Sequence, residues 1–333
     1  MSNRSNVAVL LWPQSAGLGG RHLFETLLWI PVMAVPLVAP GYTPLANQIL
    51  VMILFALSLD LLVGFTGIVT LGHAALFGTG AYAAGLLALR GIDDPILSAL
   101  LGMVAAAMVG LVTGACMLRT KGLAFLVLSL AAAFMLYELA NMATSVTGGD
   151  DGLQGISFKP VLGLFEFDFR GETAFYYTLS ALILSFFLVR RVVNSPFGWS
   201  LRGIRENDGR MRAIGCPIYQ RRLAAYVLSS ALAGLAGALQ AQTTQFVALH
   251  SLSLELSGNV LVMLILGGSG RLYGAFVGVP LFMFAQDLMA KQDPANWYLG
   301  QGLILVVMTL FVPGGALGLA GRLIAKLGRG GKR

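Results

Sequence analysis

Long apolar segments follow one another along most of the chain, and short polar stretches separate them. A helix needs about 20 apolar residues to cross the roughly 30 Å hydrocarbon core of a bilayer. The pattern therefore predicts an all-α polytopic membrane protein with about ten transmembrane helices, or eight to nine if the short and glycine-broken segments do not cross. The predicted spans are 24–40, 45–64, 68–89, 95–117, 122–143, 172–193, 223–243, 256–269, 273–290 and 297–313.

Composition supports this class and argues against a soluble fold. The chain is 57% hydrophobic and only 11% charged, whereas soluble domains have about 25% charged residues. The basic residues behind the net charge of +7 lie between the apolar spans and form no single face. Membrane topology therefore explains this charge better than nucleic-acid binding does. Cys116 and Cys216 have no metal-ligand spacing around them, so we expect two packing residues and no metal site.

A basic island at 190–222 holds eight of the 22 Lys and Arg residues. A segment with this much charge costs too much to place in hydrocarbon, so it lies outside the membrane. Short loops rich in Lys and Arg stay in the cytoplasm. With both termini cytoplasmic, the predicted topology places 18 of the basic residues inside and 4 outside. The island therefore predicts a large cytoplasmic loop.

The predicted spans divide the chain into three parts. Residues 1–23 form a cytoplasmic N-terminal segment without a signal-peptide pattern, 24–320 the transmembrane domain, and 321–333 a basic cytoplasmic tail. Within the transmembrane domain, 144–171 is a periplasmic loop and 194–222 a cytoplasmic loop. The outer loop contains TGGDDG, whose Asp150 and Asp151 either belong to a solvated connector or contact an extracytoplasmic partner.

Few polar residues within the spans could carry chemistry. Asp60, His73, Glu138 and Asp287 are ionisable, but the three carboxylates lie near span ends. His73 stands in a glycine- and threonine-rich segment, which either lines a polar pathway or packs as a hydrogen-bonded core. The candidate translocation path comprises Thr70, Gly72, His73, Gly78 and Thr79. We predict no catalytic residue.

The chain has no G-x-x-x-x-G-K-[ST] nucleotide loop, so we expect neither ATP hydrolysis nor a cofactor in this chain. Active transport would then draw its energy from another subunit, and the alternative is a self-sufficient secondary transporter or channel. Residues 198–214 alternate apolar and charged positions and predict one or two short amphipathic helices. Such helices either dock in a partner's groove or anchor to anionic lipid.

Six collinear stretches carry a resemblance to a known family. On them the chain resembles an ATP-binding-cassette (ABC) importer permease of the branched-chain amino acid (LIV) type, and its M-type subunit in particular. The stretches are GFTGIVTLGHAALFGTGAYAAG (64–85), TGGDDGLQGI (147–156), SPFGWSLRGIREND (195–208), AIGCPIYQRRLAAYVLSSALAGLAGAL (213–239), LSLELSGNVLVMLILGGSGRLYGAFVG (252–278) and NWYLGQGLILVVMTLFVPGGALGLAG (296–321).

This resemblance implies a function and a set of partners. It implies a permease in a bacterial inner membrane that imports a small polar organic solute, such as branched-chain amino acids, urea, short amides or aromatic acids. It also implies a second homologous permease subunit, two cytoplasmic ATP-binding subunits and a periplasmic solute-binding protein. The 194–222 loop would then be the ATPase-coupling loop. Its candidate coupling residues are Phe197, Gly198, Leu201, Arg202, Ile204, Arg205, Glu206, Asn207, Asp208 and Gly215.

Overall fold

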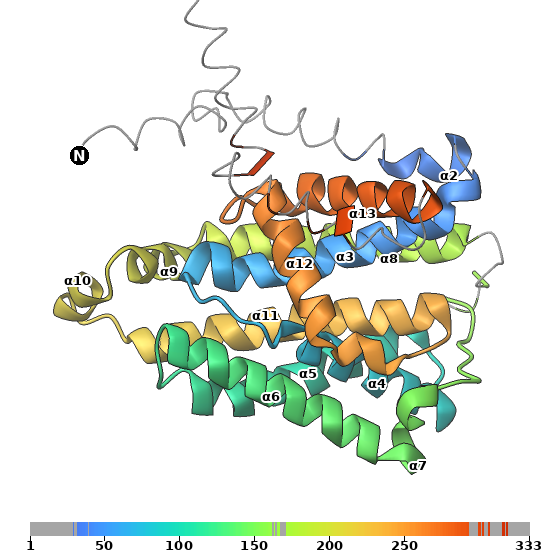
Figure 1. Cartoon of the computed structure of the whole chain (residues 1–333), viewed down its shortest axis with the longest axis horizontal. Helices are drawn as coiled ribbons and strands as arrows, with labels where there is room; N and C mark the ends of the chain where they lie inside the picture. The colour runs from blue at the N-terminus through green and yellow to red at the C-terminus, as the bar shows by residue number, and fades with distance from the viewer. Residues whose placement is uncertain are drawn as a thin grey trace, which may run out of the picture.

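The structure is a computed structural model in which long helices lie roughly side by side (Figure 1). It describes residues 29, 32–38, 40–161, 163, 165–166 and 171–292, and single positions at 299, 300, 302, 306, 315, 316 and 318. Over these residues the chain is helical, without β-strands, and has two isolated β-bridges. The predicted all-α class is therefore confirmed.

The longer helices match the predicted spans closely. They are α3 (Thr43–Asp60), α4 (His73–Leu89), α5 (Pro95–Met117), α6 (Leu123–Met142), α8 (Glu172–Val193), α11 (Ile218–Thr244), α12 (Leu254–Gly267) and α13 (Gly274–Gln292). Among the described residues, five helices are long and apolar enough to cross a membrane, and α4 and α12 are shorter apolar helices. Most of the predicted span 297–313 and the first residues of 24–40 lie outside the described residues, as do 1–23 and 321–333. The number of spans and the side of each terminus stay predictions.

Short helical segments connect the long ones. They are α2 (Val35–Val38), α7 (Thr144–Thr147), α9 (Pro196–Glu206) and α10 (Asp208–Ala213), with 3₁₀ turns at Pro40–Tyr42, Gly149–Asp151 and Leu249–Leu252. A π-helical segment, η2 (Leu61–Thr66), directly continues α3. Figure 1 shows α9 and α10 at one end of the bundle and α7 at the other.

The two ends differ in charge, and we name them for that difference. The basic end is formed by α9, α10, the α5–α6 turn at 118–122 and the α12–α13 turn at 268–273. Lys121 of the α5–α6 turn pairs with Asp208 of α10, and Gly270 of the α12–α13 turn donates to Asp60 at the end of α3. The acidic end is formed by α7, the 90–94 turn and the loop after α7, where Lys159 pairs with Asp93. The sequence predicts that the basic end is cytoplasmic.

Helix α3 lies at the centre of the bundle. It packs against α8, α11, α12 and α13, and the main apolar core gathers around it. Fully buried aromatic rings anchor this core: Phe55 lies beside Phe77 of α4, with ring centroids 4.7 Å apart. On the other side, Phe186 of α8 packs edge-on against Phe276 of α13 at 5.3 Å.

Helices α4, α5 and α11 approach one another through small residues. A Cβ atom added to Gly80 would lie 2.1 Å from the carbonyl oxygen of Gly234, and one added to Gly237 would lie 1.9 Å from that of Phe77. Small residues allow such close packing between membrane helices, where dispersion contacts provide much of the attraction. The hydrophobic pattern alone does not predict which helices meet at these glycines.

The chain is not helical at 67–72, between η2 and α4. As a result, α4 begins at His73, five residues after the start of the predicted span 68–89. Side chains from other helices accept hydrogen bonds from backbone N–H groups at this break. Ser129 Oγ accepts from the Leu71 N–H at 3.3 Å, and Ser257 Oγ accepts from the Ala74 N–H at 2.9 Å. Backbone interruptions within membrane proteins require such partners.

Candidate functional site

The predicted coupling loop folds into two short helices at the basic end. Ser195 caps α9, because its Oγ accepts a hydrogen bond from the Gly198 N–H, and Pro196 suits the first helical position. Asn207 has an extended backbone that ends α9, and its side chain then caps α10 by accepting from the Arg210 N–H at 3.0 Å. The predicted amphipathic helices are present.

One face of α9 is fixed to the bundle by apolar contacts. Leu201 and Ile204 are buried, and a Cβ atom on Gly198 would lie 2.2 Å from the Val193 carbonyl oxygen at the end of α8. Small and apolar residues at these positions therefore hold α9 against its own chain.

Two arginines of α9 contact η2. Arg205 donates from Nη1 to the carbonyl oxygen of Gly64, and the Arg202 guanidinium lies over the Phe65 ring at 5.2 Å. Helix ends leave their last carbonyl groups without intrahelical donors, so Arg205 supplies a donor where η2 ends. These contacts connect α9 to the end of the central helix.

Asp208 ties α10 to two other elements. Its carboxylate pairs with Lys121 at 2.5 Å and with Arg222 of α11 at 2.8 Å. Burial alone would raise the pKa of Asp208, but the Lys121 hydrogen bond and the Arg222 charge together hold that pKa below its ordinary value. The predicted coupling loop is therefore attached to the segment before α6 and to α11.

The remaining surface of the loop is open. Trp199 is 65% exposed and Ile214 is 75% exposed, and Glu206 is also exposed. Of the ten candidate coupling residues, Gly198, Leu201 and Ile204 are buried within the chain, Phe197, Arg202 and Asp208 are half-buried, and Arg205, Glu206, Asn207 and Gly215 are exposed. The candidate set omits Trp199 and Ile214, although a large apolar residue in a charged loop is the signal that could have found them.

The candidate translocation residues lie mostly inside the packed bundle. Thr70 and His73 are fully buried, and Gly72 and Gly78 are also buried, whereas Thr79 on α4 is partly exposed. Thr70 and Gly72 are adjacent, since Thr70 Oγ1 accepts from the Gly72 N–H at 3.2 Å. The structure gathers Thr70, Gly72 and His73 at the break before α4, and their role in a pathway stays a prediction.

His73 joins α4 to α3. Its Nε2 lies 2.9 Å from Ser58 Oγ, and its ring stacks on Phe55 with centroids 5.4 Å apart. Its Nδ1 is buried and has no hydrogen-bond partner among the described residues. His73 is therefore packed in the core, and a pathway along its segment stays a prediction.

The predicted outer-loop contact residues are accessible. Asp150 and Asp151 are exposed in a 3₁₀ turn at the acidic end, and Leu153 pairs with Val247 in an isolated antiparallel bridge. This bridge fixes the turn against the segment that follows α11. The described residues contain no group of three metal-ligating side chains.

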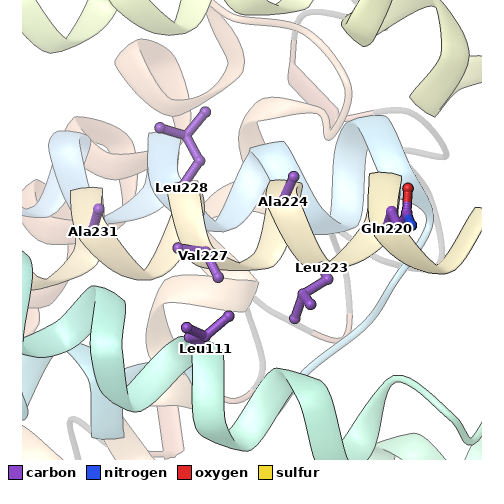
Figure 2. Close-up of a pocket in the computed structure, with 7 residues that line it drawn as sticks. All are labelled: Leu111, Gln220, Leu223, Ala224, Val227, Leu228 and Ala231. Carbon is purple, nitrogen blue, oxygen red and sulfur yellow. The ribbon is translucent and has the colours of Figure 1, made fainter.

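A groove of about 480 Å³ runs along α11 beside α5. Figure 2 shows one face of α11 lining it, with Leu111 of α5 on the opposite wall. Its lining is apolar except for one amide, and comprises Leu111, Gln220, Leu223, Ala224, Val227, Leu228 and Ala231.

Comparisons with known proteins agree with this architecture. Residues 42–312 match the family described as the permease component of branched-chain amino acid transport systems. The chain is 27% identical over 320 residues to the high-affinity branched-chain amino acid transport permease LivM of Salmonella typhimurium and to that of Escherichia coli. Each alignment covers 89% of this chain and 75% of the relative. It is 24% identical over 269 residues to the guanosine ABC transporter permease NupQ of Bacillus subtilis, covering 74% and 83%. No solved structure matches the chain.

These findings define first a class and then a family. The chain is a multi-pass membrane transport component of the ABC-transporter class. It belongs to the family of branched-chain amino acid transport system permease components, because the family match covers most of its length. The resemblance predicted from the sequence is confirmed.

Proposed function

We propose that this chain is one of two permease subunits of an ATP-driven importer in a bacterial inner membrane, and that α9 and α10 are its contact with an ATPase. One observation carries this proposal. The loop is fixed to the bundle by Leu201, Ile204 and Arg205, and it leaves Trp199 and Ile214 uncovered. Exposed aromatic and aliphatic side chains flanked by charges are typical of the central contacts of protein interfaces.

The energy source would be a separate subunit. The sequence contains no nucleotide-binding loop, so ATP would be hydrolysed by two cytoplasmic ATP-binding subunits. When these subunits close on ATP, they would displace α9, which is connected to α3 through η2. We infer that this chain itself holds no cofactor and carries no catalytic residue.

The solute would be a small polar organic molecule, and branched-chain amino acids are the first candidates. The names of the LivM relatives support this choice, while the guanosine permease among the relatives keeps a wider solute class open. A periplasmic solute-binding protein would deliver the solute at the acidic end, where Asp150 and Asp151 are exposed. A second, homologous permease would complete the pathway.

The pathway would open by separation of helices. Because Thr70, Gly72, His73 and Gly78 are buried, solute can reach them only if α4 moves away from its neighbours. The backbone break at 67–72 supports this proposal, since discontinuous helices in transporters often lie beside substrate sites.

Reconstitution tests the proposal. The chain would be purified with its second permease, ATPase subunits and binding protein, placed in proteoliposomes, and assayed with radiolabelled leucine and other candidate solutes. We expect uptake that requires ATP and every subunit. Uptake by the lone chain without ATP, driven by a proton or sodium gradient, would instead support the secondary transporter or channel.

A variant pair tests the docking surface. Trp199→Ala removes an exposed aromatic side chain at the basic end, and we expect binding of the ATPase to weaken about tenfold or more, as at interface hot spots. Phe134→Ala is the matched control, because Phe134 is an exposed aromatic residue on α6. Equal ATPase binding by both variants would contradict the assignment of the surface.

A further inference from the structure

Three segments far apart in the sequence meet at one point of the basic end. Asp60, the last residue of α3, accepts a hydrogen bond at Oδ1 from the Gly270 N–H at 2.7 Å. One turn further on, the Gly64 carbonyl accepts from Arg205 of α9. The contacts join the central helix to α9 on one side and to the α12–α13 turn on the other.

Glycines make this arrangement possible. A Cβ atom on Gly64 would lie 2.1 Å from Asp60 Oδ1 and 2.4 Å from the Gly270 nitrogen. The Arg205 side chain passes two further glycines: a Cβ atom on Gly67 would lie 2.9 Å from its Cγ, and one on Gly270 would lie 3.0 Å from its Nη1. Gly67 and Gly270 also have positive φ angles of 73° and 78°, which disfavour other residues.

The Asp60 carboxyl group is buried where these segments meet. Asp60 is 1% exposed, and its Oδ2 has no hydrogen-bond partner among the described residues. A buried carboxylate needs polar partners, and the Gly270 N–H that donates to Asp60 lies beside the Arg205 guanidinium. Withdrawal of Arg205 would leave the Gly64 carbonyl oxygen without this donor. Displacement of α9 is therefore resisted unless the ends of α3 and α12 follow.

We propose that Arg205 is the positioning residue that transmits movement of α9 to the basic ends of α3 and α12. The Gly64 carbonyl is its anchor, and the hydrogen bond between Asp60 and Gly270 extends the connection to the α12–α13 turn. This inference rests on the proposed function as an ATP-driven permease. It separates two roles within the coupling loop, because Trp199 and Ile214 contact the ATPase whereas Arg205 faces inward to the bundle. Arg205 is also classed as exposed, so its truncation removes no side chain of the apolar core.

The first experiment compares transport with ATP hydrolysis in the reconstituted complex. With Arg205→Ala we expect ATPase binding and hydrolysis within about twofold of the wild type. We expect leucine uptake to fall about tenfold, because one charge-assisted hydrogen bond is lost. Arg205→Lys keeps a charged donor and should recover part of the uptake. Arg119→Ala removes an exposed charge at the same end and should behave as the wild type.

A second readout does not depend on the solute. Spin labels at Ile265 of α12 and Met135 of α6, both exposed, report the distance between these helices with and without vanadate-trapped nucleotide. We expect trapping to change this distance in the wild-type complex and to leave it unchanged in Arg205→Ala.

The outcomes separate this inference from the function on which it rests. A wild-type complex without ATP-dependent uptake and without a distance change would overturn both. A distance change that persists in Arg205→Ala, or an unchanged ratio of uptake to hydrolysis, would overturn only the role of Arg205. Proportional loss of ATPase binding and both activities would show that Arg205 serves docking, which also overturns the inference.

Discussion

Two apolar helices of similar composition, α3 and α6, occupy opposite environments. Within their most apolar stretches, 94% of the residues of the span that contains α3 are buried, but only 17% of those of α6. Helix α3 packs against four long helices, whereas α6 presents Val127, Phe134, Met135 and Leu139 outward. Two strongly apolar sequences thus form the centre and the periphery of one bundle.

This difference shows what positions a helix in a bilayer. Lipid tails are as apolar as leucine, so hydrophobicity brings both helices into the membrane without bringing them together. Close packing and polar contacts then select the neighbours. Around α3 the contacts are made by the stacked Phe55 and His73 rings, the Ser58 hydroxyl and the Asp60 carboxylate. For α6, a close approach occurs at Gly72, where an added Cβ atom would lie 2.3 Å from the Ser129 carbonyl oxygen.

The largest difference in stability is expected between truncating an aromatic side chain in α3 and truncating one in α6. Phe55→Ala opens a cavity between α3 and α4 and should lower the free energy of unfolding by about 3–5 kcal/mol, the usual range for buried phenylalanine. Phe134→Ala on α6 removes a side chain that is 53% exposed, and should cost under about 0.5 kcal/mol. Reversible unfolding in mixed detergent micelles measures both, and equal losses would contradict the comparison.

A smaller effect is expected where α6 meets the bundle. Gly72→Val places a side chain against the Ser129 backbone and should destabilise the protein by about 1–3 kcal/mol, as overpacking does. Because α6 has few other contacts, we expect it to move outward while α3 stays in place. Hydrogen exchange should then increase in α6 and not in α3. Gly258→Val is the control, since nothing lies within 4 Å of its Cβ position.

The hydrogen bond between α3 and α4 should matter less. Ser58→Ala leaves the buried His73 Nε2 without its partner and should cost about 1–2 kcal/mol, the penalty for an unsatisfied buried polar group. Ser180→Ala on α8 serves as the control, because its hydroxyl is exposed and bonds only to its own helix. Thermal unfolding of both variants tests the prediction, which fails if the two midpoints fall equally.

The smallest change in stability is expected at the ion pairs of Asp208, which lie beside the start of α6. Asp208→Asn weakens the pairs with Lys121 and Arg222 and should cost about 1 kcal/mol or less, since partly exposed ion pairs contribute little. The pKa of Asp208 is lowered in the folded chain, so its contribution is complete above the ordinary aspartate pKa of about 3.9. It is lost as the pH falls through the lower, folded-state value. The unfolding free energies of wild type and variant, measured as the pH is lowered, should converge at acid pH. A difference that stays constant would contradict the assignment.

Much of the fold could be predicted from hydrophobic patterning. The predicted spans 95–117 and 172–193 coincide with α5 and α8, because turn residues and charges delimit these apolar segments sharply. The start of α4 could not be predicted, since 68–72 is apolar enough for a span but its backbone is held by Ser129 of another helix. For the coupling loop, the sequence indicated the helices but not which residues face inward.

The class of protein, its differently charged ends, the amphipathic loop and the family could all be predicted from the residues in order. These properties depend on apolar length, charge distribution and local residue order, which are all present in the linear chain. The central place of α3, the peripheral place of α6, the stacking of His73 on Phe55 and the contact of Arg205 with Gly64 were visible only in the folded chain. The physical reason is that lipid and protein interiors are equally apolar, so the choice between them depends on packing and polar contacts between distant residues.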